Sequence, residues 1–174
     1  MEFNLSKSIE VLKNTPLVLD AYLSNLSDDW INNNEGDLTW SPYDVLGHLV
    51  FGEKTDWMVR IQIILSDSEQ KIFEPFDRFA QFSDAPNETM GELIHTFKHL
   101  RAENVLKLEN LNISETQLKL KGIHPEFGEV TLEQLISTWV VHDLGHIAQI
   151  SRVMARQYKQ EVGPWIEYLG ILKK

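Results

Sequence analysis

The sequence predicts an all-α protein built on a bundle of long helices. Helix-start signals recur along the chain, and long segments follow three of them. No stretch alternates apolar and polar residues with the period of a half-buried strand. The 174 residues suit a single domain over residues 1–174, and a hydrophobic share of 43% suffices for a globular core.

The first helical region is expected to be divided. Thr15-Pro16 has the form of an N-cap residue followed by proline at the first helical position. We therefore expect one helix near 4–14 and a second near 16–26.

Three long helices and one short helix are expected in the rest of the chain. Thr89 and Thr131 begin capping boxes, and Ser41 is an N-cap residue followed by proline with an acid at the third helical position. The expected positions of the long helices are 42–66 after Ser41-Pro42, 89–111 after Thr89 and 132–159 after Thr131, with the short helix at 164–171 after Gly163-Pro164.

Two long connections join these helices. Residues 67–88 contain four phenylalanines, at positions 73, 76, 79 and 82, which we expect to be buried against the bundle. Residues 112–130 form the second connection. Loops of this length often form lids or binding loops, and a structural crossover is an equally good interpretation of each.

The composition excludes several classes of protein. The 26 acidic and 16 basic residues give a net charge of −10, which argues against nucleic-acid binding. With no cysteine in the chain, any bound metal has nitrogen and oxygen ligands. The N-terminus has no apolar signal region, and no stretch is long enough to span a membrane, so we expect a cytoplasmic protein.

Two histidines of the last long helix lie on the side that faces the core. His146 falls within the apolar arc, and His142 lies one turn earlier toward its edge, so the two imidazoles can converge. Asp143 also falls on the apolar side. Two desolvated imidazoles suit a divalent metal, although hydrogen-bonded core histidines are the alternative and the spacing alone is a weak signal.

The other four histidines differ in their setting. His95 and His99 have the same spacing but lie opposite the apolar arc of their helix, so we expect them in solvent. His124 precedes Pro125 in a loop, where a local packing or capping role is expected. His48 is a candidate third ligand, but its helix is apolar over so wide an arc that periodicity does not decide where it points.

Four charged residues fall on the apolar sides of their helices. Such charges are costly in a core unless they are paired or functional. Ion pairs that cross the bundle are the favoured interpretation, and a polar pocket around the metal, with an arginine meeting an anionic substrate group, is the alternative. The four are Glu53, Asp56, Arg60 and Arg101.

Two motifs resemble a known family. Residues 40–49, WSPYDVLGHL, and residues 139–150, WVVHDLGHIAQI, are similar to the second and last bundle helices of the DinB-like (YfiT-like) superfamily, and the Gly163-Pro164-Trp165 tail also fits. The resemblance implies a four-helix bundle with short additional helices and long crossover loops. It further implies a homodimer and a divalent metal, zinc or nickel, held by His48, His142 and His146.

The resemblance also implies a range of chemistry. Relatives of this fold include transferases that use bacillithiol, mycothiol or glutathione, so a small-molecule thiol is the expected cosubstrate. A site with three histidine ligands and an open position can alternatively activate water for hydrolysis. A non-catalytic metal-binding bundle is the third possibility.

Overall fold

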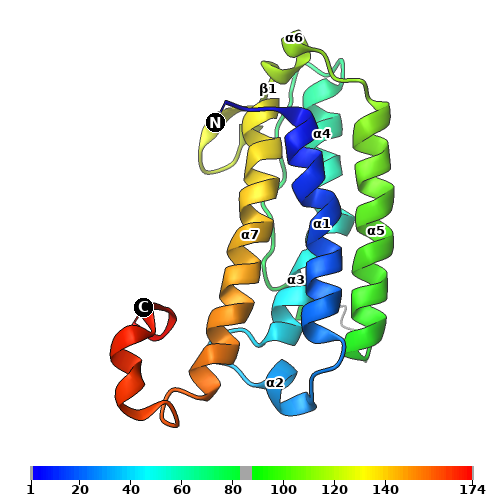
Figure 1. Ribbon diagram of the computed structural model, residues 1–174. Coiled ribbons are helices and arrows are strands. Elements are labelled where there is room, and N and C mark those ends of the chain that lie inside the picture. The colour runs from blue at the N-terminus through cyan, green and yellow to red at the C-terminus, as the bar shows by residue number, and fades with distance from the viewer. Residues whose placement is uncertain (1, 83–87, 174) are drawn as a thin grey trace.

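The computed structural model describes residues 2–82 and 88–173 and has the predicted four-helix bundle (Figure 1). Its long helices are α1 (Leu5–Leu23), α3 (Pro42–Thr55) with its continuation α4 (Trp57–Leu65), α5 (Met90–Asn110) and α7 (Leu132–Gln157). The short helical elements are α2 (Asp28–Asn32), α6 (Glu115–Leu118) and the 3-10 turns η1 (Ala80–Phe82), η2 (Gly163–Tyr168) and η3 (Gly170–Leu172).

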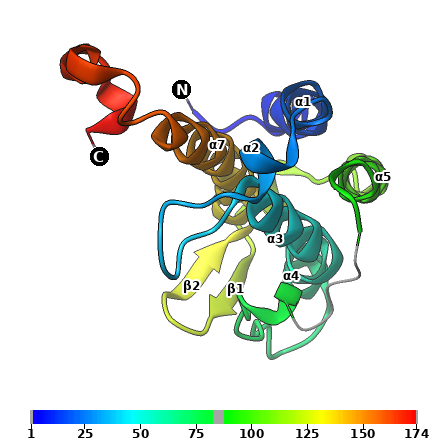
Figure 2. The same cartoon turned by 90° about the horizontal axis from the view of Figure 1, so that it is seen from below.

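The four long helices surround one core, as the view along the bundle in Figure 2 shows. Helix α1 packs against α5 and α7, and α3 packs against the same two helices on the other side. The C-terminal turns η2 and η3 lie beside the C-terminal end of α7, and η3 packs against that helix (Figure 1). They replace the short α-helix expected near 164–171.

Helix α1 is continuous, so the expected division at Thr15-Pro16 is wrong. Pro16 lies within α1 and has no N–H to donate to the carbonyl of Leu12, four residues earlier. The buried guanidinium of Arg101 on α5 donates to that carbonyl instead, with Nη1 at 3.0 Å from the oxygen. A donor from a distant part of the chain therefore compensates for the bond that the proline removes.

The helix expected over 42–66 is interrupted at Asp56, where α3 ends and α4 begins. The Asn104 side chain of α5 donates to the backbone carbonyl of Glu53 at 2.8 Å, beside this interruption. An amide from α5 therefore stabilises the backbone at the break.

The second long connection contains a β-hairpin that the sequence analysis did not predict. Strand β1 (Lys121–His124) pairs antiparallel with β2 (Gly128–Thr131), and Gly128 adopts a positive φ of 71° at the turn. Phe73 N–H donates to the Ile123 carbonyl at 2.9 Å, so the first connection attaches to β1. Two strands of four residues are too short to produce a sustained alternation in the sequence.

The phenylalanines of the first connection differ in burial, contrary to the expectation that all four are buried. Phe73 is 1% exposed, and Phe76 is partly buried against the bundle. Phe79 and Phe82 are 59% and 48% exposed. Residues 83–87 of the loop predicted over 67–88 lie outside the described part of the chain.

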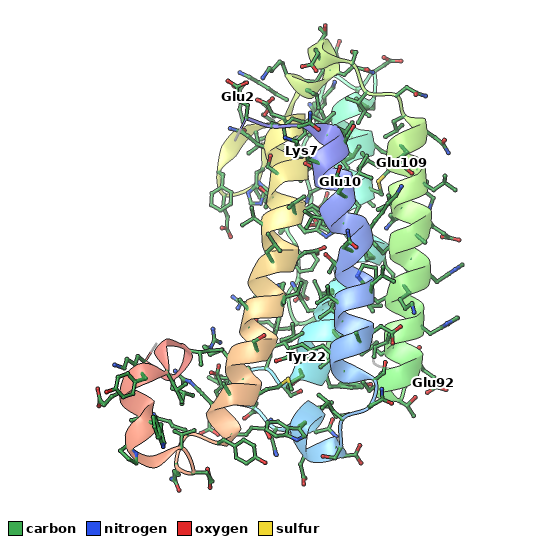
Figure 3. The ribbon with its side chains drawn as sticks, in the orientation of Figure 1. Glu2, Lys7, Glu10, Tyr22, Glu92 and Glu109 are labelled. Atoms are coloured by element: carbon green, nitrogen blue, oxygen red, sulfur yellow. The ribbon has the colours of Figure 1, made fainter. Side chains whose placement is uncertain are left out.

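The core has two apolar halves with charged residues between them. One half includes Leu12, Trp57 and Ile136, and the other includes Leu19, Leu46 and Phe97. The acidic surplus lies outside: Figure 3 shows Glu10, Glu92 and Glu109 on the outer surfaces of α1 and α5. Within the described residues, no helix is long and apolar enough to cross a membrane.

Candidate metal centre

Three histidines from two helices converge between α3 and α7. His48 Nε2 and His146 Nε2 each lie 3.1 Å from His142 Nε2, and the ligand atoms of the three residues all lie within 4.8 Å of one another. Nitrogen ligands of a tetrahedral zinc ion, at about 2.0–2.1 Å from it, are separated by about 3.3 Å. Two of the three nitrogen–nitrogen distances are therefore close to those between ligands of a divalent ion, and the third nitrogen pair lies within 4.8 Å.

The hydrogen-bonding partners also fit a metal. His146 Nδ1 lies 2.8 Å from Gln149 Oε1, which accepts from Nδ1–H and leaves the lone pair of Nε2 directed toward the other two rings. A neutral imidazole carries a single ring hydrogen, so hydrogen bonds among the three rings cannot use all the converging Nε2 atoms well. A cation at their focus satisfies all three lone pairs.

Burial keeps the three imidazoles in the neutral form that binds metals. It lowers the pKa of His48 to about 4 and that of His142 to about 3. Burial also lowers the pKa of His146, while the Gln149 hydrogen bond and the nearby Asp143 charge oppose the shift. At neutral pH protons therefore do not compete with a metal for these nitrogens.

Two capped helices set the direction of the ligands. Ser41 and Asp44 form a complete capping box at the start of α3, and Thr131 and Gln134 form another at the start of α7. Because α7 runs without interruption from its cap through His142 and His146, the i, i+4 spacing places both rings on one face.

A buried ion cluster lies beside the histidines. Arg101 of α5 donates to Glu53 of α3 at 2.8 and 3.0 Å and to Asp143 of α7 at 2.5 and 3.0 Å. The side chains of Glu53 and Asp143 are fully buried, and that of Arg101 is 1% exposed. The indole N–H of Trp139 adds a donor to Glu53 at 3.1 Å.

Aromatic rings connect this cluster to the metal centre. Trp139 stacks on Trp57 with ring centroids 5.6 Å apart, and Trp57 contacts His142 edge to face at 5.1 Å. On the other side of the centre, Phe76 of the first long connection contacts His48 edge to face at 5.4 Å. These rings shield the imidazoles from water and restrict the orientation of the imidazole rings.

The residues proposed around the metal separate into two groups. Glu53, Arg101 and Asp143 form the ion cluster, in which each charge is already paired. Asp56 and Arg60 form a second pair, 2.6 Å apart, which lines a different pocket against Glu74. The structure thus agrees with the favoured interpretation of ion pairs within the bundle.

His95 and His99 lie in solvent as expected, whereas His124, expected in a loop, is the last residue of strand β1. His95 and His99 are exposed on α5, and His99 approaches Glu103 at 3.2 Å. His124 Nδ1 accepts backbone N–H groups of Glu126 and Phe127 in the hairpin turn. Neither pattern resembles the convergence at His48, His142 and His146.

A pocket of about 400 Å³ opens onto the metal centre. His48 and His146 are among its lining residues, and most of the other lining residues were not candidates in the sequence. Gln149 follows His146 by three positions on α7, a spacing that the sequence could have revealed. No periodicity marks the others, which belong to irregular segments or to the outer side of α7. They include Glu35, Trp40, Arg78 and Arg152.

Comparisons with known proteins agree with the fold. The profile of the DinB superfamily matches residues 12–150. YfiT from Bacillus subtilis, described as a probable metal-dependent hydrolase with an unusual four-helix bundle topology, superposes with a TM-score of 0.72; its sequence is 21% identical, and the match covers 88% of this chain and 87% of YfiT.

A second solved structure supports the same architecture. The four-helix bundle protein TT2238 matches with a TM-score of 0.55 and 16% identity, over 85% of this chain and 98% of that one. No curated protein matches the sequence significantly.

Proposed function

This chain belongs to the DinB superfamily, and we propose that it is a metal-dependent transferase that conjugates a low-molecular-weight thiol to an electrophile. The observation that supports the proposal is the convergence of three neutral imidazoles, those of His48, His142 and His146, at one point beside an open pocket. Zinc and nickel are the proposed ions, because imidazole is a favourable ligand for both. Bound there, such an ion lowers the pKa of a coordinated thiol from about 8.5, which makes the thiolate available at neutral pH.

The protein's own residues prepare this site in three ways. Burial keeps the imidazoles neutral, the Gln149 side chain fixes the tautomer of His146, and Trp57 and Phe76 pack against the rings. His48 and His146 line the pocket, so a small molecule bound in it lies beside two of the three proposed ligands without passing through the core.

A thiol nucleophile suits the groups around the pocket better than water does. Hydrolysis usually requires an acid or base that moves protons to the leaving group. Among the described residues that line the pocket, Glu35 is the only carboxylate, and it pairs with both Arg152 and Arg156. The chain also contains no cysteine, so no protein thiol competes with a cosubstrate.

Hydrolysis is the second candidate function. The likeness to YfiT, described as a probable metal-dependent hydrolase, favours it. The two candidates differ in their need for a thiol. Turnover of ester or amide substrates without thiol would favour the hydrolase. Metal-dependent conjugation of bacillithiol, mycothiol or glutathione to a model electrophile would favour the transferase, and its absence with all three thiols would reject it.

The metal centre itself can be tested by metal content. We expect about one divalent ion per chain in the wild type and a large loss in His48→Ala, His142→Ala and His146→Ala, because two nitrogen ligands bind a divalent ion much less tightly than three. The chain offers a matched control, since His95 and His99 have the same spacing on an exposed surface. The double variant His95→Ala/His99→Ala should keep its metal.

Stoichiometric metal in all three single variants would overturn the assignment of ligands. Circular dichroism of each variant at the same temperature checks that the helices remain folded. Loss of metal from the control double variant would show that surface histidines contribute, which also contradicts the assignment.

A further inference from the structure

The walls of the pocket above the metal centre carry an unexpected charge. The whole chain has a net charge of −10, yet among the described residues the charged ones that line this pocket are one acid, Glu35, and two bases, Arg78 and Arg152. Two cations and a single carboxylate therefore line the same pocket as His48 and His146. A cleft with a local charge opposite to that of the chain indicates the charge of the molecule that it admits.

Arg78 has an unused guanidinium. Its Cζ lies 5.9 Å from the ring centre of Trp40 and 5.5 Å from that of Phe79, and it makes no hydrogen bond or ion pair with any described residue. Stacking on the aromatic rings orients the planar group while leaving its N–H donors available. Trp40 in turn packs on His48, with ring centroids 4.9 Å apart, so Arg78 is close to the metal centre.

Arg152 retains donors as well. Glu35 accepts from Arg152 Nε at 2.9 Å and from Nη2 at 2.8 Å, which leaves Nη1 for another partner. Glu35 also pairs with Arg156 at 3.0 Å, so this one carboxylate is shared by two guanidinium groups and is only 6% exposed. The acid at the pocket is thus already neutralised.

Gln149 supplies a third donor. Its Oε1 faces Nδ1 of His146, so its amide nitrogen is left with two N–H groups at the pocket wall. Arg78, Arg152 and Gln149 together surround a space rich in donors and without a free carboxylate among the described lining residues. Oxyanions match this arrangement, because carboxylates and phosphates accept several charge-assisted hydrogen bonds at once.

Arg60 and Arg101, which the sequence offered for contact with an anionic substrate as the alternative to ion pairs, are both already paired. Arg60 pairs with Asp56 in another pocket, and Arg101 pairs with Glu53 and Asp143 in the core. Arg78 is therefore the arginine of this pocket that has no hydrogen bond or ion pair with any described residue.

We propose that the substrate pocket selects a small anionic molecule and that Arg78, assisted by Arg152 and Gln149, binds its carboxylate or phosphate group while the rest of the molecule reaches the three histidines. This inference rests on the proposed function, since it assigns the substrate class of the same site. If the inference holds, either the thiol or the electrophile that it attacks carries a carboxylate or phosphate group.

The first experiment compares two thiols of the same chain length, one ending in a carboxylate and the other in a neutral hydroxyl group. Cobalt-loaded protein is titrated with 3-mercaptopropionate and with the neutral 3-mercapto-1-propanol, and the dissociation constants are taken from the sulfur-to-cobalt absorption band. We expect the acid to bind about tenfold more tightly. Arg78→Met should abolish most of this preference without changing the metal content or the binding of the alcohol. Lys107→Met, which removes one charge from the outer face of α5, should retain it.

The second experiment needs neither metal nor thiol. Propionate and inorganic phosphate are added to the metal-free protein, and NMR follows the side-chain N–H signals of Arg78 and Gln149, the former assigned by its loss in Arg78→Met. Shifts with either anion support the proposal, and the stronger binder identifies the anionic group. If no thiol binds but these signals shift, the thiol transferase is rejected while the anion site stands. Equal affinity for acid and alcohol, together with unchanged signals, would overturn the anion site and leave the metal centre intact.

Discussion

Replacing Arg101 with methionine should strongly destabilise the protein. The substitution keeps the apolar stem but leaves the carboxylates of Glu53 and Asp143 buried without their cation. Removing one partner of a buried ion pair costs about 3–5 kcal/mol, and an unsatisfied buried carbonyl, here that of Leu12, costs about 1–3 kcal/mol more. We expect the free energy of unfolding to fall by about 4 kcal/mol or more.

Urea denaturation followed by tryptophan fluorescence measures this loss. Arg101→Lys keeps the charge but cannot contact both carboxylates through a planar fork, so it should fall between the wild type and Arg101→Met. The control Lys107→Met changes an exposed residue whose nearest carboxylate is 3.9 Å away, and it should stay within about 0.5 kcal/mol of the wild type. A loss below about 1 kcal/mol in Arg101→Met would refute the reasoning.

A double-mutant cycle isolates the contact with Leu12. Pro16→Ala restores an N–H that can donate to the Leu12 carbonyl, which matters only when Arg101 no longer does so. The effect of Pro16→Ala on the unfolded chain is the same in the wild type and in Arg101→Met, so it cancels in the cycle. We expect Pro16→Ala to stabilise Arg101→Met by about 1 kcal/mol more than it stabilises the wild type. Zero coupling would mean that the guanidinium does not compensate for the proline.

Two further predictions concern acid and packing. The metal-free protein should lose stability as the pH falls from about 6.5 toward about 4. Burial lowers the pKa of His48 to about 4 and that of His142 to about 3, so the unfolded chain binds protons before the folded chain does. Each of these histidines should make the free energy of unfolding fall by about 1.4 kcal/mol per pH unit in this range. Urea titrations across this range should give a shallower slope for His142→Gln, and an unchanged slope would argue against a buried neutral imidazole. Gly122→Ala should cost about 1–3 kcal/mol, because the added carbon would lie 2.5 Å from the Phe73 ring, whereas Gly91→Ala meets no atom within 4 Å and should be tolerated in the same thermal melts.

The sequence predicted much of the fold and site because the relevant signals are local. Ser41-Pro42 marked the start of α3, and capping boxes marked the starts of α5 and α7. Helical periodicity placed His142 and His146 toward the core and His95 and His99 in solvent. Periodicity could not place His48, because α3 contacts α2, α5 and α7 and is buried over a wide arc. The expectation that His48 is the third metal ligand came from the family resemblance.

Other features depend on contacts between distant parts of the chain. Thr15-Pro16 is a valid local start signal, but Arg101, 89 residues from Leu12, makes a continuous helix possible. The hairpin depends on its attachment to residues 71–73 as well as on its own short strands. Arg78 lies in an irregular segment, and only the folded chain brings it beside Trp40 and the metal centre.

The ion cluster and the metal centre depend on the same alignment of helices. From α5, Arg101 contacts the Leu12 carbonyl of α1, Glu53 of α3 and Asp143 of α7, so one side chain joins all four long helices. Asp143 immediately follows His142 in α7, and Glu53 lies on α3, the helix that carries His48. Rotation or sliding of α3 against α7 would therefore break directional hydrogen bonds before it separated the imidazoles, whereas an apolar layer would resist such movement less specifically. By this reasoning Arg101→Met should weaken metal binding even though Arg101 contacts none of the three ligands, and unchanged metal affinity in that variant, once folded, would show that the histidines are aligned by packing alone.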